Sequence, residues 1–506
     1  MTRSSRECCR TDTVGRAGER ERRAGGRLRP ALAACSLVVW ARAPARARSR
    51  RFWSVKQFKI GNSWIRGVVG NGLTAELVTD FACAYGTYVG GREVVLVRDT
   101  RASSPMFGAA ALAGLLSTGC SVADAGVCPT PVAQYLVRRR RAGGGIAVTG
   151  SHNAAGWNAL KFIDEDGALL NSIRGEEVLD LYHLGEYTKA SWDRLGKREE
   201  ATGFVGSYLA ATAGTLNVES IRAAKLRVAV DTVNGTAGAV IREFLGFLGC
   251  EPILINEEMG PDFAHDPAPS ARNMRQLESL LRHIEADVGF AVNTDVDRVG
   301  IVTEKGVALS EECTFPLVAD HVFARGSAVA VTNLSTSMMI DRVAERRGGR
   351  IIRTKIGEGY VIFRAVNEDA VLAGEGSGGV ALMPVSRAFD GFLTMALVLE
   401  AMAEGGHRIS ELAGRLPAFL MKKGEIPCSP DRVYHVLEEF RGFHRGGQVD
   451  LSDGVRAAWP GHWIHVRASN TEPILRVIVE GEDPERVERV FADTLFRVNT
   501  VVHGKS

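Results

Sequence analysis

Residues 149–161 read Thr-Gly-Ser-His-Asn-Ala-Ala-Gly-Trp-Asn-Ala-Leu-Lys and directly follow the apolar run at 145–148. A buried strand that runs into this polar loop would expose one hydroxyl, Ser151, with the imidazole of His152 beside it and the ammonium group of Lys161 ten residues on. A serine placed in this way is a candidate covalent nucleophile. The same residues also suit an ordinary turn between a strand and a helix, so both interpretations stay open at this point.

A second polar stretch, NTDVDR at 293–298, follows another apolar run. Alternate residues of an extended segment point the same way, so Asn293, Asp295 and Asp297 can present oxygens to one point. Two carboxylates and an amide oxygen suit a hard divalent cation, Mg²⁺ rather than Zn²⁺, because no His or Cys joins them. Arg298 adds a rigid fork for phosphate oxygens. The alternative is a solvated acidic turn; an EF-hand is excluded because no Gly-x₅-Glu continuation follows.

Two more loops carry polar groups that suit a phosphosugar. The run GEGSGG at 374–379 has glycines that let the backbone approach a ligand, and Glu375 and Ser377 could hold sugar hydroxyls. The run RASNTEPILR at 467–476 contains two guanidiniums, two hydroxyls and loop amides, which could cradle a phosphate. Taken singly, each loop could equally be a surface turn.

In this order and spacing, the four loops resemble those of the α-D-phosphohexomutase superfamily, which comprises phosphoglucomutase, phosphomannomutase and phosphoglucosamine mutase. The resemblance covers residues 56–500 and includes Ile-Arg-Gly at 65–67, VRDTR at 97–101 and Pro-Thr-Pro at 129–131. The WNALK run at 157–161 and the GEGSGG loop are most similar to the archaeal-type phosphoglucosamine mutases.

The chain also repeats internally. A strand, a polar loop, a helix and a second strand recur in residues 93–124, 226–255 and 328–352. Connections of this kind are crossovers, and they predict sheets covered by helices. The C-terminal part differs, because two strands are followed there by a helix from Pro484, and this order predicts an α+β arrangement.

Repetition and resemblance together predict an α/β protein, with three related mixed-sheet α/β domains plus a C-terminal α+β domain around a central cleft. The expected units are an unstructured Arg-rich extension at 1–51, domain I with the serine loop at 55–200, domain II with the metal loop at 201–306, domain III with the sugar loop at 307–419, and domain IV with the phosphate loop at 420–506.

The resemblance implies a phosphohexose mutase, an isomerase that interconverts hexose 6-phosphate and hexose 1-phosphate through a phosphoserine at Ser151 and a hexose 1,6-bisphosphate that also primes it. Mg²⁺ would bind between the phosphate of Ser151 and Asn293, Asp295 and Asp297. Glucosamine phosphate is the favoured substrate, with glucose or mannose phosphates as the alternative. The expected catalytic residues are Ser151, His152, Lys161 and Arg66. The expected substrate-binding residues are Arg298, Lys355, Glu375, Ser377, Arg467, Ser469, Asn470, Thr471 and Arg476.

Three departures from the family pattern bear on activity, of which one is Trp64 and Ala154 in place of the family's usual Gly and Pro. Asn293 stands where the family commonly has Asp, and Gly379 stands where it often has His, which removes a candidate acid/base. Lys161 and His152 are then the expected proton carriers, because a buried lysine flanked by cations can have a lowered pKa. A metal-dependent phosphomonoesterase and a catalytically impaired sugar-phosphate binder remain as alternatives. Four separate ligand loops favour the mutase, since a hydrolase has no need to bind its substrate both ways round.

Composition agrees with a metabolic enzyme. A chain of 506 residues, 45% hydrophobic and 24% charged, is too long for one core and predicts several domains. The net charge of +3 comes from residues 1–51, which hold 14 Arg, no Lys and 4 acids, leaving a net charge of −7 on the rest. This balance does not indicate a nucleic-acid partner. Nine scattered cysteines fit reduced, cytoplasmic thiols.

The apolar run at 31–40 is too short to span a bilayer, so no membrane association is expected. We interpret residues 1–51 as a dispensable extension, with a targeting peptide as the alternative. The expected partner is a phosphosugar, and the expected state is a monomer or homodimer.

Overall fold

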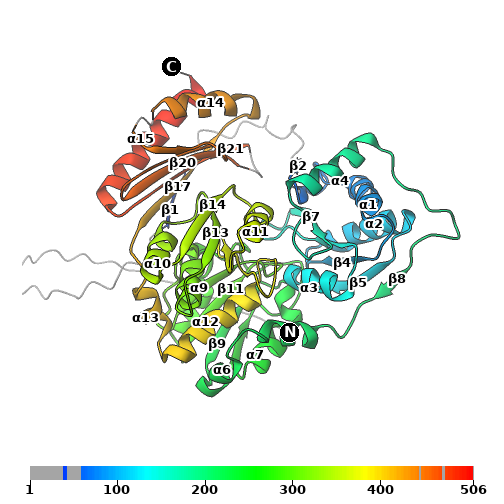
Figure 1. Cartoon of the computed structure of the whole chain (residues 1–506), viewed down its shortest axis with the longest axis horizontal. Coiled ribbons are helices and arrows are strands. Elements are labelled where there is room, and N and C mark those ends of the chain that lie inside the picture. Colours follow the sequence, from blue (N-terminus) through cyan, green and yellow to red (C-terminus); the bar gives the residue numbers. More distant parts are fainter. Residues whose placement is uncertain (1–37, 43–57, 444–445, 470–472, 505–506) are drawn as a thin grey trace, which may run out of the picture. The chain divides into compact units, whose positions relative to one another are not determined.

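The computed structural model describes residues 38–42, 58–443, 446–469 and 473–504, and all of them belong to one compact unit, Ala34–Ser506. The described strands form four sheets, and helices pack beside them (Figure 1). None of the described helices is both long and apolar enough to cross a bilayer.

The first sheet has seven strands in the order β2-β3-β7-β6-β4-β5-β8. Its strands are β2 (Phe58–Ile60), β3 (Trp64–Val68), β4 (Val94–Arg98), β5 (Val122–Val127), β6 (Gly144–Val148), β7 (Trp157–Asp164) and β8 (Arg198–Glu200). The helices of this part are α1 (Ala75–Val89), α2 (Ser104–Ser117), α3 (Thr130–Arg140) and α4 (Ser172–Leu184). Strands such as β4 read as continuous apolar runs because helices cover both faces of their sheet.

The next two sheets have four strands each, in the orders β10-β9-β11-β12 and β14-β13-β15-β16. The second sheet and its helices comprise α5 (Val205–Ala213), α6 (Val218–Ala224), β9 (Arg227–Asp231), α7 (Ile241–Phe247), β10 (Glu251–Ile255), α8 (Arg275–Leu281), β11 (Val288–Val292) and β12 (Val299–Thr303). The third comprises α9 (Thr314–Phe323), β13 (Val329–Asn333), α10 (Met339–Arg347), β14 (Arg350–Thr354), α11 (Glu358–Asn367), β15 (Leu372–Gly374), β16 (Val380–Leu382), α12 (Gly391–Gly405) and α13 (Ile409–Gly414).

The predicted repetition is confirmed by strand pairing. In the second and third sheets, two parallel pairs are followed by one antiparallel pair, β11–β12 and β15–β16. The four central strands of the first sheet, β5-β4-β6-β7, follow the same pattern and end on the antiparallel pair β6–β7. Three modules of one topology therefore precede the C-terminal part.

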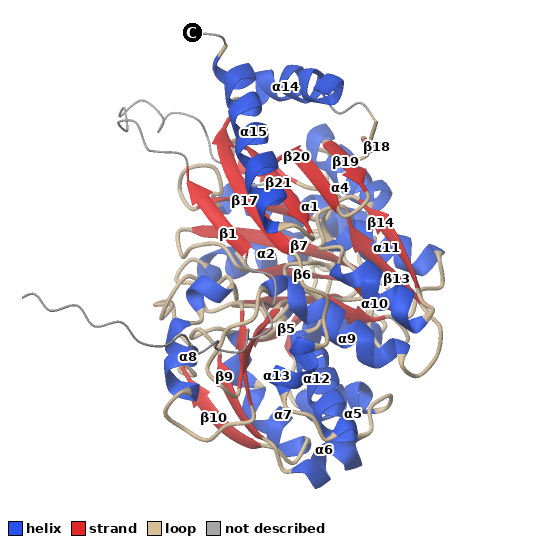
Figure 2. Cartoon of the chain, turned by 90° about the vertical axis from the view of Figure 1, so that its left-hand side faces the viewer, coloured by secondary structure: helices blue, strands red, loops and turns tan. Residues whose placement is uncertain are grey.

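The fourth sheet, in the order β1-β17-β21-β20-β19-β18, is antiparallel except at one edge. Its elements are β17 (Leu420–Pro427), α14 (Pro430–Phe443), β18 (Gln448–Asp450), β19 (Val455–Trp459), β20 (His462–Ala468), β21 (Ile474–Gly481) and α15 (Pro484–His503). Figure 2 shows α15 lying along the sheet beside β17 and β21, and α15 buries one apolar stripe that includes Val487, Phe491 and Val498. The α+β prediction for this part is confirmed.

The N-terminal extension differs in part from its prediction. Val38–Arg42 forms β1, which pairs in parallel with Met421–Glu425 of β17. The structural reason is that β17 is otherwise an edge strand whose backbone groups are available to another strand. Residues 1–37 and 43–51 lie outside the described residues.

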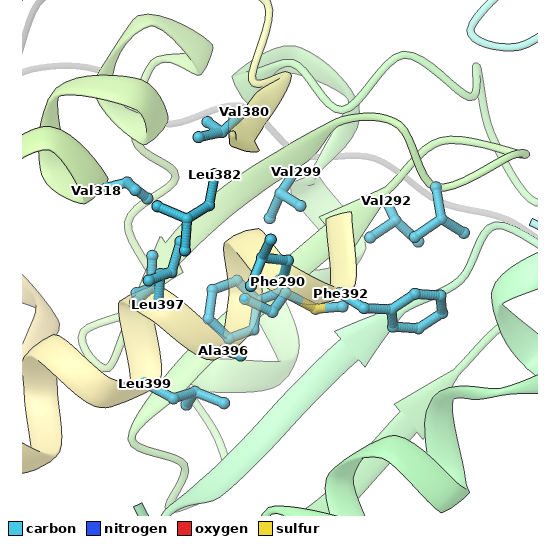
Figure 3. Packing of buried hydrophobic residues seen from close by; sticks show 14 of the residues in the cluster. Phe290, Val292, Val299, Val318, Val380, Leu382, Phe392, Ala396, Leu397 and Leu399 are labelled. Atoms are coloured by element: carbon cyan, nitrogen blue, oxygen red, sulfur yellow. The ribbon is translucent and has the colours of Figure 1, made fainter. Parts of the chain in front are cut away.

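The second and third modules share a hydrophobic core that also extends into the first module, and α12 packs between the second and third. Figure 3 shows Phe392, Ala396 and Leu397 of α12 among side chains of both modules, including Phe290 of β11 and Leu382 of β16. A helix that is apolar on nearly all sides must be buried on nearly all sides. This packing fixes the loops after β11 and β15 relative to each other.

Candidate active site

The serine, metal and sugar loops occupy the same place in the three modules. Each joins the third strand of its module to the antiparallel fourth strand: β6 to β7, β11 to β12, and β15 to β16. The metal and sugar loops are joined directly, because the backbone N–H of Val299 donates to the carbonyl of Gly378 at 3.0 Å. Equivalent hairpins from different modules thus converge on one site.

The serine loop is held in an unusual conformation by groups from the end of β4. Ser151 has φ +50°, in the left-handed region that non-glycine residues seldom occupy. The buried guanidinium of Arg101 donates to the carbonyls of Ser151 and Asn153, both at 2.7 Å. Asp99 accepts from Arg101 Nε at 2.9 Å and from Thr149 Oγ1 at 2.9 Å. These contacts stabilise the conformation that positions the serine hydroxyl.

The serine and metal loops meet through a dense set of buried hydrogen bonds. Ser151 Oγ lies 3.4 Å from Asp297 Oδ2 and 3.4 Å from His152 Nδ1. Thr294 Oγ1 donates to the Ser151 carbonyl at 2.9 Å. Thr130, at the start of α3, donates to Asp295 through its backbone N–H at 3.0 Å and its hydroxyl at 2.8 Å. The predicted nucleophile and acidic loop are therefore brought together.

Lys161 bridges the two carboxylates. Its Nζ lies 2.6 Å from Oδ2 of both Asp295 and Asp297. Burial alone would lower the pKa of Lys161, but the two carboxylates outweigh it and raise the pKa above its usual value. The prediction of a lowered pKa was wrong, because it counted neighbouring cations and missed these anions. Lys161 is a fixed ammonium rather than a proton acceptor.

Asn293 is oriented differently from the prediction. Its Oδ1 accepts the backbone N–H groups of Asp297 and Arg298, both at 3.1 Å. Its Nδ2 faces the cluster and lies 3.0 Å from Ser151 Oγ, 2.9 Å from Asp295 Oδ1 and 2.6 Å from Asp297 Oδ1. The amide oxygen is thus turned away from the point where a cation would bind, and only the two carboxylates present oxygens there.

His152 and Arg66 lie beside Ser151, where His152 lines a cleft and Arg66 contacts the cleft residue Asn153. Burial and the nearby Arg298 lower the pKa of Arg66 to about 10, so it stays charged at neutral pH. Its Nη1 donates to Asn153 Oδ1 at 2.7 Å, and its buried Nε has no partner among the described residues. Burial, Arg298 and Arg66 lower the pKa of His152 well below its usual value, so the imidazole is neutral. A charged donor beside a neutral imidazole suits an incoming anion.

A cleft of about 470 Å³ opens beside this cluster. Residues of the three modules and of the C-terminal part line it. Six of the residues predicted from the sequence line this cleft: His152, Arg298, Glu375, Ser377, Arg467 and Arg476. Glu375 Oε1 accepts the N–H of Gly357 at 2.8 Å. The buried Ser377 Oγ has no hydrogen-bond partner within the part of the chain that the structure describes. A hydroxyl of this kind is suited to a ligand.

The remaining predicted residues differ in burial and in their position relative to the cleft. Arg467 is buried and its Nε lies 3.0 Å from Asp453 Oδ1, while Ser469 is buried and accepts from Lys59 Nζ through its carbonyl at 2.7 Å. Lys355 is exposed, with Nζ 5.6 Å from the centre of the Tyr360 ring, and does not belong to the cleft lining. Asn470 and Thr471 lie outside the described residues.

Several residues at the site were not predicted as functional. Asp99 and Arg101 belong to the VRDTR run at 97–101, which indicated the family but no role for either residue. Their position directly after β4 could have marked them, because the other site loops also follow strands. Glu358 begins α11, and its Oε1 accepts the N–H of Phe389 at 3.0 Å. Burial raises the pKa of Glu358 to about 8, with Lys161 opposing and Asp297 adding to the shift. No pattern in the sequence marks this carboxyl.

Four domain models match the chain, all of phosphoglucomutase/phosphomannomutase. They are the α/β/α domain I at residues 57–187, domain II at 206–306 and domain III at 312–419, and the C-terminal domain at 424–495. Fold, site and sequence thus define a phosphohexose mutase, an isomerase of hexose phosphates. The chain belongs to the phosphoglucomutase/phosphomannomutase family.

Similar proteins cover most of the chain. A phosphoglucomutase/phosphomannomutase of Thermococcus kodakarensis is 32% identical over 84% of this chain and 95% of its own length. A probable phosphoglucosamine mutase of Methanopyrus kandleri is 32% identical over 85% and 95%. Among solved structures, a phosphoglucomutase/phosphomannomutase family protein of Burkholderia thailandensis is 26% identical, with a TM-score of 0.77 over 88% of this chain and 99% of that one. The resemblance inferred from the four loops is confirmed.

Proposed function

We propose that the protein interconverts hexose 6-phosphate and hexose 1-phosphate with Ser151 as the phosphoryl carrier. The observation that carries this proposal is the convergence of Ser151 with Asp297 and the Asp295–Lys161 pair beside a cleft lined by guanidinium groups. A nucleophile among fixed positive charges is the arrangement that phosphoryl transfer needs, because catalysis there depends chiefly on positioning and charge neutralisation.

In the proposed step, a hexose hydroxyl attacks the phosphorus of phosphorylated Ser151. A bond forms between phosphorus and the sugar oxygen, and the bond to Ser151 Oγ breaks with its electron pair going to Oγ. Neutral His152, whose Nδ1 lies 3.4 Å from Oγ, takes the hydroxyl proton and passes it to Oγ. Lys161 and Arg66 stay charged throughout and stabilise the moving phosphoryl group.

The other roles are part of the same proposal. Asp295, Asp297 and the phosphate on Ser151 offer hard oxygen ligands that would hold Mg²⁺, which when bound neutralises charge on the phosphoryl oxygens. Glu375 and Ser377 would hold sugar hydroxyls, and the orphaned Oγ of Ser377 supports this. The phosphate that is not reacting would be held by domain IV and a neighbouring loop, through Arg298, Arg467, Ser469, Asn470, Thr471 and Arg476.

We further propose glucosamine phosphate as the preferred hexose. The support is the name of the Methanopyrus relative and the presence of Glu375 in the cleft lining, where a carboxylate suits an ammonium on the sugar. A hexose 1,6-bisphosphate would prime the enzyme. We place the activity in the cytoplasm, where phosphosugars occur, with the chain acting as a monomer or homodimer.

The test is a coupled assay with glucosamine, glucose and mannose 6-phosphates, each primed with its 1,6-bisphosphate. Peptide mapping should place about one phosphate on Ser151 of the wild-type protein. Ser151→Ala should carry none and should lose turnover by about a thousandfold or more. Ser191→Ala, at an exposed serine, is the matched control and should retain both. Full activity of Ser151→Ala would refute the proposal. Release of inorganic phosphate would support a phosphomonoesterase instead, and binding without turnover an impaired binder.

A further inference from the structure

The metal loop contains an amide nitrogen at the position where the family commonly has a carboxylate. The direction of the Asn293 side chain is dictated by the loop itself, because the N–H groups of Asp297 and Arg298 both donate to its Oδ1 at 3.1 Å. Backbone N–H groups can only donate, so they must face the oxygen of an amide and leave its NH₂ group to face the cluster. An Asp at the same place would satisfy both N–H groups with one oxygen and direct the other toward the cluster.

The loop has little freedom to reverse this arrangement. Val296 is buried and has φ +60°, a conformation that a β-branched residue adopts only where the surroundings impose it. The Val296 carbonyl accepts the N–H of Gly391 at 2.9 Å, at the start of the buried helix α12. The backbone that orients Asn293 is therefore anchored in the core shared by two modules.

The carboxylates around Asn293 are already engaged by donors. Asn293 Nδ2 contacts Oδ1 of both Asp295 and Asp297, and Lys161 Nζ contacts Oδ2 of both. Among the described residues, no three His, Cys, Asp or Glu side chains gather in a way that could hold a metal ion. A divalent cation at this point would meet two carboxylates, one NH₂ group and a competing ammonium.

We propose that Asn293 is a positioning and charge-stabilising donor to Ser151, which makes this site less dependent on a divalent cation than one with a third carboxylate. The inference rests on the proposed phosphoryl transfer at Ser151. When the bond between phosphorus and Oγ breaks, the electron pair stays on Oγ. Asn293 Nδ2 lies 3.0 Å from Oγ and turns one of its two N–H groups, which it shares with the neighbouring carboxylates, to the charge that develops there until the proton arrives. Asn293 and Lys161 together supply part of the stabilisation that a bound cation would provide.

The experiment compares wild type with Asn293→Asp in metal binding and in metal dependence. Mn²⁺ affinity is measured by electron paramagnetic resonance on protein without substrate, so the result does not depend on mutase activity. Asn293→Asp should bind Mn²⁺ about tenfold tighter or more, because it adds a charged oxygen ligand and removes a donor. Asn171→Asp is the matched control, since Asn171 caps α4 through an oxygen that Asp also offers, and its affinity should equal that of wild type.

The second measurement is turnover with excess chelator. Wild type should keep a clearly larger fraction of its metal-saturated rate than Asn293→Asp, at least about fivefold larger. Equal Mn²⁺ affinity in wild type and Asn293→Asp, or an equal fractional loss on chelation, would overturn the inference. If Asn293→Asp does not fold, the wild-type protein decides the question by itself. Tight Mn²⁺ binding by wild type, together with complete loss of wild-type turnover in excess chelator, would overturn the inference. A lack of mutase activity in wild type with the expected Mn²⁺ difference would instead count against the proposed function.

Discussion

Replacing Lys161 with Met should destabilise the protein strongly and in a pH-dependent way. The Nζ of Lys161 lies 2.6 Å from one oxygen of Asp295 and 2.6 Å from one of Asp297, and the three side chains are at most 8% exposed. Removing one partner of a buried ion pair leaves an uncompensated buried charge and costs about 3–5 kcal/mol. For a cooperative unit of domain size this corresponds to a fall in Tm of roughly 10 °C.

The sign of the pH dependence follows from the carboxylates. Burial would raise the pKa of Asp297, but Lys161 and Arg298 lower it below its usual value, so its ion pair stabilises the folded state above the unfolded pKa and is lost as pH falls. In Lys161→Met this contribution disappears, and burial with mutual repulsion raises the pKa of the Asp295–Asp297 pair. The deficit relative to wild type should therefore be largest near pH 7.5 and shrink toward pH 5, as one carboxyl takes up a proton.

Calorimetry at several pH values from 5 to 7.5 measures the deficit. The control is Lys305→Met, which removes an exposed lysine 4.0 Å from Glu304, where less than about 1 kcal/mol and no comparable pH trend are expected. A Lys161→Met protein that melts within 2 °C of wild type at pH 7.5, or whose deficit does not change with pH, would refute the argument that this ammonium neutralises the buried pair.

Two further predictions concern α11 and the N-terminal strand. Burial raises the pKa of Glu358 to about 8, so the folded state keeps a proton that the unfolded chain loses near 4.5, and wild-type stability falls as pH rises between these values. Glu358→Gln should remove that fall, which a pKa shift from 4.5 to about 8 sets at up to about 5 kcal/mol, and an unchanged pH profile in denaturation measurements would contradict the raised pKa. Deleting residues 1–42 removes β1 from β17 and should lower stability by about 2 kcal/mol and promote aggregation, whereas deleting residues 1–37 should do neither. Equal melting of the two truncated proteins would show that β1 does not stabilise the sheet.

The fold and the main site loops could be predicted because both depend on short segments of neighbouring residues. Each of the serine, metal and sugar loops follows an apolar strand, and the three modules repeat one order of strand, loop and helix. A repeated topology places equivalent loops at equivalent sheet positions, so their convergence follows from the pattern. The strand β1 escaped prediction because its pairing depends on the exposed edge of β17, nearly four hundred residues away in the chain.

The properties of individual site groups depended on contacts that sequence order does not reveal. Lys161 has a raised pKa because its carboxylate partners come from another module. Arg101 supports the serine loop through carbonyls about fifty positions further along the chain. Electrostatic effects of this kind depend on distance and burial rather than on residue type, so the same lysine could have had a lowered or a raised pKa.

Asn293 shows most clearly how geometry changes the meaning of a substitution. From the sequence, Asn in place of Asp removes one formal charge and leaves an oxygen that can still bind a cation. In the structure, the N–H groups of Asp297 and Arg298 claim that oxygen, and the group that faces Ser151 is a hydrogen-bond donor. An acceptor has become a donor at the point where charge develops, which is a larger change than the loss of one charge. Lys161 shares the two carboxylates with this donor, so the two side chains together neutralise the site from within the protein.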